Sequence, residues 1–171
     1  MKLVAARPGI VRRSMNIWPP FLFSGIKITD LPEDFLSATV RLRLRWWNRN
    51  VAGVLFGGSL FAMTDPFWMM LLLRHLGKEN VIWDRAAEID FIKPGRGDVV
   101  AHFAITEADI ERLRKAASGG AKVLEWFTVE VRDSTGDVVA RVRKQVYLRR
   151  KRDLPVPGSA TSLPSPDQAV R

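Results

Sequence analysis

Cysteine is absent from this chain of 171 residues, and histidine occurs only twice, at His75 and His102. Without cysteine the protein has no disulfides, no thiol nucleophile and no cysteine-bound metal. Two histidines far apart in the sequence are too few for a histidine-rich metal site. We therefore expect a protein that works without a metal or a cofactor.

The beginning of the chain lacks a long apolar segment, because Arg7 and Pro8 follow only a few apolar residues. A signal peptide needs a longer apolar region, so a cytoplasmic location is the expectation. Acidic residues are in the minority, with 18 Asp and Glu against 27 Lys and Arg and a net charge of +9. This excess suits an anionic partner, such as nucleic acid, an anionic membrane or a phosphate-bearing molecule, and it equally suits a role in solubility alone.

The composition divides the chain into three parts. Residues 1–13 are expected to form a loose N-terminal arm, followed by a short helix from Ser14 to Trp18 that Pro19 stops. Residues 14–152 have an ordinary globular composition and are expected to form a single domain. Residues 153–171 are rich in Pro and Ser and lack apolar periodicity, which predicts a disordered tail.

Apolar periodicity predicts the secondary structure of the middle part. Residues 57–76 are apolar nearly all round, which predicts a buried helix of roughly 30 Å. Thr106, with Asp109 three residues later, predicts the capped start of a second, short helix. Alternating patterns predict six strands, over 25–29, 36–46, 81–92, 98–105, 122–132 and 138–149, with a hairpin turn at 133–137. The fold class is therefore α+β, with a long central helix wrapped by a curved antiparallel sheet of five to six strands.

One carboxylate, Asp65, lies in the middle of the apolar segment. Burying an ionised group without a partner is costly, so Asp65 needs a partner or a function. The same charge argues against a membrane span. The dipeptide Asp65-Pro66 also suits a helix break, with Asp65 as an N-cap and Pro66 at the first position of a new helix.

The spacing of Asn50, the pair Gly57-Gly58 and Asp65, which follows seven residues after the second glycine, resembles the hotdog-fold acyl-CoA thioesterases of the phenylacetic-acid-degradation type. The segments 44–50 and 62–66 resemble an uncharacterised bacterial branch of that superfamily. The likeness covers roughly residues 14–151. The chain departs from the usual pattern at Phe56, where the family has His, at Pro66, and at Asp84, where many relatives have Ser or Thr.

The resemblance implies a hotdog fold and the hydrolysis of an acyl-CoA or a similar thioester by a homodimer or a dimer of dimers. Gly57 and Gly58 would offer backbone N–H groups to the developing oxyanion. Asp65 of the neighbouring subunit would act as a base or a nucleophile, and Asn50 would position the water or the substrate. The two glycines also suit a purely structural role, in which they let the helix pack closely against the sheet.

Phe56, Asp84, Arg41 and Arg43 are further candidates for contacts with the substrate. Arg41 and Arg43 alternate with apolar residues on one predicted strand, which suits either contacts with coenzyme A phosphates or a solvated face. Regular alternation would place Asp84, Glu88 and Asp90 on one face of another strand. Such a row suits an acid/base pair or, more simply, a face in water.

Two other functions stay open at this point. A hotdog domain can bind acyl groups or coenzyme A without catalysis, and the departures at Phe56 and Pro66 favour this alternative. A nucleic-acid-binding domain would use the arginine-bearing strands and the basic tail, and it is the less favoured alternative.

Overall fold

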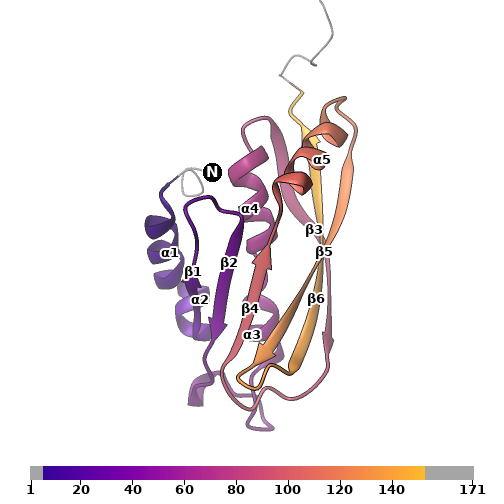
Figure 1. Cartoon of the computed structure of the whole chain (residues 1–171). Coiled ribbons are helices and arrows are strands. Elements are labelled where there is room, and N and C mark those ends of the chain that lie inside the picture. The colour runs from indigo at the N-terminus through magenta and orange to yellow at the C-terminus, as the bar shows by residue number, and fades with distance from the viewer. Residues whose placement is uncertain (1–5, 153–171) are drawn as a thin grey trace, which may run out of the picture.

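The computed structural model describes residues 6–152, which form one six-stranded antiparallel sheet with helices packed against it (Figure 1). The strand order is β1-β2-β4-β5-β6-β3. This arrangement confirms the α+β class and the six strands. Their bounds are β1 Ile26–Asp30, β2 Ser37–Leu42, β3 Asn80–Phe91, β4 Val99–Ala104, β5 Val123–Asp133 and β6 Val138–Arg150.

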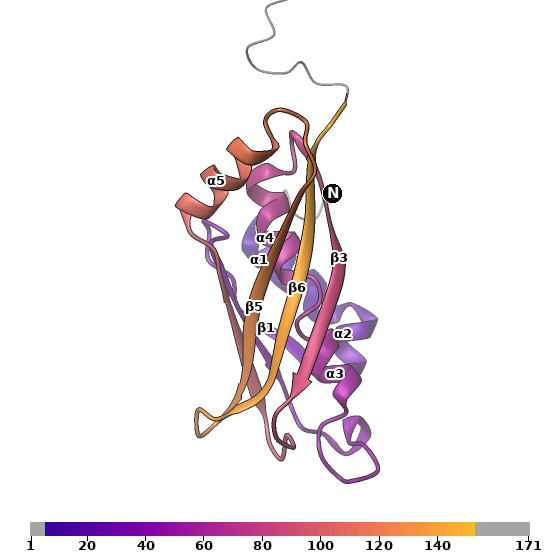
Figure 2. The ribbon, with the colours of Figure 1, turned by 90° about the vertical axis from the view of Figure 1, so that its right-hand side faces the viewer.

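Two helices, α3 and α4, follow one another along a single face of the sheet (Figures 1 and 2). Most apolar side chains of α4 are buried there, and the ring of Phe67 stacks on that of Phe103 from β4 at 4.8 Å between centroids. None of the helices in residues 6–152 is long and apolar enough to cross a membrane. The helices are α1 Pro8–Ile17, α2 Pro19–Ser24, α3 Gly57–Ala62, α4 Phe67–Leu76 and α5 Glu107–Ala117, with a 3₁₀ turn, η1, over Trp46–Asn48.

The prediction of one continuous helix over 57–76 is wrong at Asp65 and Pro66. Proline has no N–H to donate to the preceding turn, and it disfavours the helical conformation at the residue before it. Helix α3 therefore ends at Ala62, and α4 begins at Phe67. The alternative of a break at this dipeptide is confirmed, but the residue at the N-cap of α4 is Pro66, and no side chain caps that helix.

The N-terminal prediction also needs correction. Helix α1 begins at Pro8, not at Ser14, because Val11 and Met15 give it a buried face in the main core. The side chain of Asn16 exchanges two hydrogen bonds with the backbone of Ile28, at 2.7 and 3.1 Å, and so binds the free edge of β1. Residues 1–5 and the predicted tail over 153–171 lie outside the described residues.

The strand predicted over 36–46 is shorter than expected and ends at Leu42. Its neighbours β1 and β4 pair with it only as far as this residue, at Ile26 and Val99. Beyond it, a 3.1 Å hydrogen bond from the Arg43 N–H to the Gly25 carbonyl remains, and the strand ends. The chain turns instead into η1, and the side chain of Trp46 is 80% exposed. Trp46 therefore does not share the buried face of Val40.

Two local predictions are confirmed. Thr106 and Asp109 form the reciprocal capping box at the start of α5. The turn at 133–137 joins β5 and β6, with a 3.0 Å hydrogen bond from the Asp133 N–H to the Asp137 carbonyl and Gly136 at a φ of 87°. Both features are specified by residues close in sequence.

Candidate active site

The first turn of α3 leaves the backbone N–H groups of Gly57 and Gly58 without a hydrogen-bond partner in residues 6–152. The next two N–H groups, of Ser59 and Leu60, donate to the carbonyl of Phe56 at 3.0 and 3.2 Å. The start of a helix always leaves its first N–H groups without an intrahelical acceptor, and the partial positive charge there attracts an anion or a polarised oxygen. The backbone at Gly57 can therefore donate to a ligand.

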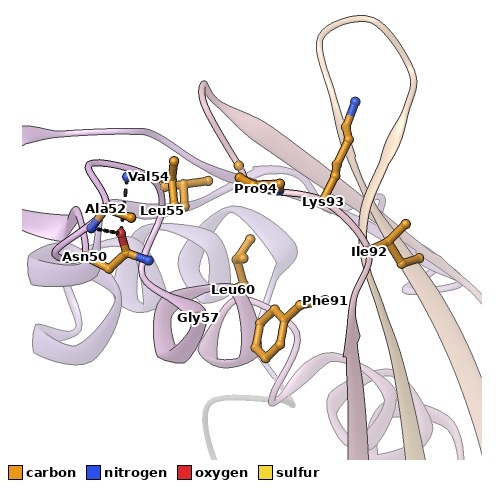
Figure 3. Close-up of a pocket in the computed structure, with 11 residues that line it drawn as sticks. Asn50, Ala52, Val54, Leu55, Gly57, Leu60, Phe91, Ile92, Lys93 and Pro94 are labelled. Carbon is orange, nitrogen blue, oxygen red and sulfur yellow. Dashed lines mark hydrogen bonds between the residues drawn. The ribbon is translucent and has the colours of Figure 1, made fainter.

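A pocket of about 520 Å³ opens beside this turn (Figure 3). Its walls are mostly apolar and come from the loop before α3, from α3 itself and from the end of β3 and the segment that follows. Asn50 and Gly57 both line it, so the structure brings together two of the predicted site residues. The apolar part of the lining includes Val54, Leu55, Leu60, Phe91, Ile92 and Pro94.

Asn50 has two roles in its loop. Its side-chain oxygen accepts hydrogen bonds from the N–H groups of Ala52 and Val54, at 2.9 and 3.3 Å, which fixes the turn before α3. Its side-chain nitrogen has no hydrogen-bond partner within the described part of the chain, and Figure 3 shows it directed toward α3. Asn50 is thus both a turn residue and a donor available to the pocket.

Two aromatic rings pack against the glycine pair. A Cβ atom at Gly57 would lie 2.9 Å from Cζ of Phe91, and one at Gly58 would collide with the ring of Phe56. The alternative of close packing against the sheet is therefore supported at Gly57, whereas the ring beside Gly58 belongs to Phe56 at the start of α3 itself. Phe56 is 56% exposed and lies with Gly58 in a separate depression lined by Trp47 and Ser59, so it does not line the pocket of Asn50.

Asp65 does not line this pocket either. It lies at the break between α3 and α4, and its side chain is 59% exposed. Its partner is Lys144 of β6, whose side chain is only 2% exposed and whose ammonium group is hydrogen-bonded to the Asp65 carboxylate. The structure of one chain therefore separates the carboxylate from the glycine pair, at opposite ends of α3.

Lys144 is a site residue that the sequence analysis missed. Its ammonium group donates to the Asp65 carboxylate, to the Asp65 backbone carbonyl at 3.0 Å and to Oδ2 of Asp84 at 3.0 Å. These bonds use all three donors of an ammonium group. The sequence alternation of β6 could have identified it, because Lys144 occupies an inward position between the buried Val142 and Val146.

Asp84 reaches Lys144 because β3 contains a bulge. Asp84 pairs with Val146 and Ala86 with Gln145, so Arg85 is an extra residue that shifts the alternation of the strand. Burial raises the pKa of Asp84, while the hydrogen bond and the positive charge of Lys144 act in the opposite direction. The other carboxyl oxygen of Asp84, Oδ1, is buried and has no hydrogen-bond partner within residues 6–152.

The bulge also corrects the prediction of a carboxylate row. Glu88 lies on the opposite face of β3 from Asp84 and forms a 3.0 Å ion pair with Arg143. Asp84 is instead close to Asp65, with Lys144 bonded to both carboxylates.

The remaining candidates lie elsewhere. Arg41 and Arg43 belong to β2 and its end, far along the strand order from β3, and neither lines the pocket of Asn50. A ring nitrogen of His75 contacts the Phe35 carbonyl, and a ring nitrogen of His102 contacts the Thr39 hydroxyl. Within residues 6–152, no group of three or more His, Asp or Glu side chains is placed to hold a metal ion.

Comparison with known proteins supports the fold. The family model described as "Domain of unknown function (DUF4442)" matches residues 9–148. No curated protein matches the chain by sequence. A Pseudomonas aeruginosa protein, described as of unknown function and a probable thioesterase, superposes with a TM-score of 0.76 at 19% identity, over 85% of this chain and 97% of that one.

Two other solved structures are similar. A Haemophilus influenzae thioesterase superposes with a TM-score of 0.63 at 13% identity, over 85% of this chain and 92% of that one. A Chlorobaculum tepidum protein of unknown function superposes with a TM-score of 0.66 at 15% identity, over 86% of this chain and 99% of that one. These likenesses show that the domain has the hotdog fold of thioesterases, as the sequence resemblance implied.

Proposed function

Because the chain belongs to the DUF4442 family of domains of unknown function and has the thioesterase-like hotdog fold, we propose that it hydrolyses a thioester, with an acyl-CoA as the expected substrate. The observation that carries the proposal is the unpaired N–H of Gly57 at the wall of an apolar pocket, beside the free amide nitrogen of Asn50. Such a site offers hydrogen bonds to a carbonyl oxygen and apolar contacts to an acyl chain.

The chemistry follows from that geometry. Water adds to the thioester carbon, the carbonyl oxygen gains negative charge, the C–S bond breaks, and a carboxylic acid and a free thiol leave. The N–H of Gly57 stabilises the charge on the oxygen, and Asn50 holds the water or the carbonyl. Loss of one preorganised donor of this kind typically raises the barrier by about 3 kcal/mol. Phe56, on the other side of the glycine pair, is expected to contact the thiol part of the substrate.

The carboxylate in this proposal comes from a second copy of the chain. The exposed Asp65 of one subunit faces the Gly57 pocket of its partner, and it takes a proton from the attacking water and passes it to the leaving thiolate. Alternatively its carboxylate attacks the carbonyl carbon, the thiolate leaves, and water hydrolyses the resulting anhydride to the carboxylic acid and free Asp65. Lys144 acts as a positioning residue, because its bonds to Asp65 and Asp84 fix one carboxyl oxygen of Asp65. The other oxygen is then left for the reaction.

The two edges of the sheet support a dimer formed through β3. At the β1 edge, Asn16 of α1 occupies backbone groups of Ile28, so that edge is covered. The β3 edge is 12 residues long and carries exposed apolar side chains, including Trp83 and Phe91. An open edge of this kind is a template for pairing with another strand. We therefore expect a homodimer, or a dimer of dimers, in which two β3 strands pair.

A thioesterase assay tests the proposal. Release of free thiol is measured with short, long and aryl acyl-CoAs for the wild type and for Asp65→Asn, with circular dichroism as the check of folding. We expect turnover of at least one substrate class by the wild type and a loss of about a hundredfold or more in the variant, since the base or nucleophile is gone. Equal inactivity of both proteins on every substrate contradicts the proposal.

A binding module without catalysis is the second candidate. It is favoured by the ring of Phe56, which covers one side of Gly58, and by the commitment of one Asp65 oxygen to Lys144. It predicts saturable binding of a non-hydrolysable acyl-CoA by a wild type that shows no turnover. Nucleic-acid binding through the arginines of the sheet is less favoured, because Arg141 and Arg143 are paired with Glu130 and Glu88.

A further inference from the structure

Another cavity, of about 460 Å³, lies where α1 meets the solvent-facing side of β1 and β2. It is at the opposite edge of the sheet from β3, and it shares no lining residue with the pocket of Gly57. Figure 1 shows α1 alongside β1 at this edge. Its lining carries four basic side chains and no carboxylate: Arg12 and Arg13 from α1, Lys27 from β1 and Arg41 from β2.

These four cations are not neutralised within the described part of the chain. None of them forms an ion pair there, although many other basic residues of the domain do. Arg12 donates to the Thr29 carbonyl at 3.2 Å. Nε of Arg41 is buried and has no hydrogen-bond partner in residues 6–152. A buried donor without a partner is unfavourable, and a bound water or anion would satisfy it; only an anion would also offset the repulsion among the four cations.

Arg43, just after the end of the same strand, has an acidic partner, in contrast to Arg41. It follows Arg41 by two residues and lies near Asp98, with Nε and Oδ2 4.0 Å apart. Asp98 also accepts a hydrogen bond from the Leu44 N–H at 3.0 Å, which holds the carboxylate in place. The contrast is therefore between Arg43, which has a carboxylate beside it, and Arg41, which has no anionic partner among the described residues.

We propose that this cavity binds the phosphate or diphosphate group of a small molecule. Guanidinium groups match phosphate oxygens with paired N–H donors, and three of the four cations here are arginines. The side chain of Asn16 at the rim is already bonded to Ile28. The four cations then supply most of the remaining donors of the lining, which favours a compact, highly charged group. The site stands independently of thioester hydrolysis.

Titration calorimetry at constant ionic strength tests this site, with pyrophosphate, ADP and adenosine as probes for the wild type, Arg41→Met and Arg43→Met. Lys27→Met, an exposed position, is a second variant in case Arg41→Met affects folding. We expect saturable binding of pyrophosphate and ADP but not of adenosine. Arg41→Met should weaken it about tenfold and Lys27→Met about threefold, while Arg43→Met should leave it within about twofold.

Two results overturn the proposal. One is the absence of saturable pyrophosphate and ADP binding by the wild type. The other is an equal loss in Arg41→Met and Arg43→Met, which would mean diffuse attraction to a chain of net charge +9. Vesicles with phosphorylated lipid headgroups and a duplex oligonucleotide form additional arms. If the protein binds vesicles or the oligonucleotide but not pyrophosphate, and Arg41→Met does not weaken that binding, the result also counts against the site.

Discussion

The two ends of the short helix α3 differ in how their backbone polar groups are paired. At its start, the N–H groups of Gly57 and Gly58 have no partner in residues 6–152, and an apolar pocket lies open beside them. At its end, the interruption at Pro66 frees the Asp65 carbonyl, and Lys144, 79 residues further along the chain, bonds to it. A polar group left unpaired beside a cavity is available for binding, whereas one that is paired by a buried side chain holds the fold together.

Lys144→Met should have the largest effect, because it removes the partner of two carboxylates and of a backbone carbonyl at once. We expect a loss of about 3 kcal/mol in the free energy of unfolding, measured by urea denaturation, together with loss of any thioesterase activity. Arg114→Met is the matched control, since it removes only the exposed pair with Glu111 on α5, and should change stability by about 0.5 kcal/mol or less.

A double variant tests whether the stability lost in Lys144→Met comes from leaving the buried Asp84 carboxylate without its partner. Lys144→Met combined with Asp84→Leu replaces a buried ion pair by apolar groups, and such replacements often restore stability. We expect the double variant to unfold at a higher urea concentration than Lys144→Met alone. If it is less stable than that single variant, Asp84 is not the carboxylate that suffers from the loss of Lys144.

Gly57→Ala should separate the two effects, with activity lost and stability kept. The new Cβ lies 2.9 Å from the ring of Phe91, which has to move into the pocket or away from it. We expect kcat/KM to fall roughly tenfold to a hundredfold, and the free energy of unfolding to change by no more than about 1 kcal/mol. Gly97→Ala, where no atom lies near the added carbon, is the control and should retain full activity.

The pH dependence of stability due to Asp84 is the smallest expected effect. Its sign shows whether burial or the ion pair with Lys144 has the larger influence on the pKa of Asp84. Burial is the larger influence and raises its pKa above the value of the unfolded chain. This carboxyl group therefore contributes stability below pH 3.8, and the contribution is lost as the pH rises through the raised pKa. In urea denaturation from pH 3 to 7, the wild type should lose stability relative to Asp84→Asn as the pH rises. The opposite slope would mean that Lys144 outweighs burial.

The parts of the fold that the sequence predicted correctly depend on neighbouring residues. The capping box of Thr106 and Asp109 and the hairpin turn at 133–137 are specified within five residues. The strand alternation and the apolar character of 57–76 were enough for the α+β class. Asn50 and Gly57, which the family resemblance singled out, both line the pocket because they flank a single short loop, and their roles stay a prediction.

The parts that could not be predicted depend on contacts between distant segments. A regular alternation was assumed for β3, and the extra residue Arg85 turns Asp84 inward. The partner of Asp65 comes from β6, where Lys144 reads as one more basic residue in a basic strand. The buried face of α1 exists only because Val11 and Met15 meet a core built by the rest of the chain.

The central claim is that the two ends of α3 meet across subunits, with the Asp65 of one chain acting at the Gly57 pocket of the other. Mixing Asp65→Asn and Gly57→Ala proteins after reversible unfolding tests it directly. If both parents are nearly inactive, the mixture should regain about a quarter of the wild-type rate, because half of the dimers are mixed and each of those has one intact site. A mixture no more active than its parents, with mixed dimers shown by mass spectrometry, would contradict the claim.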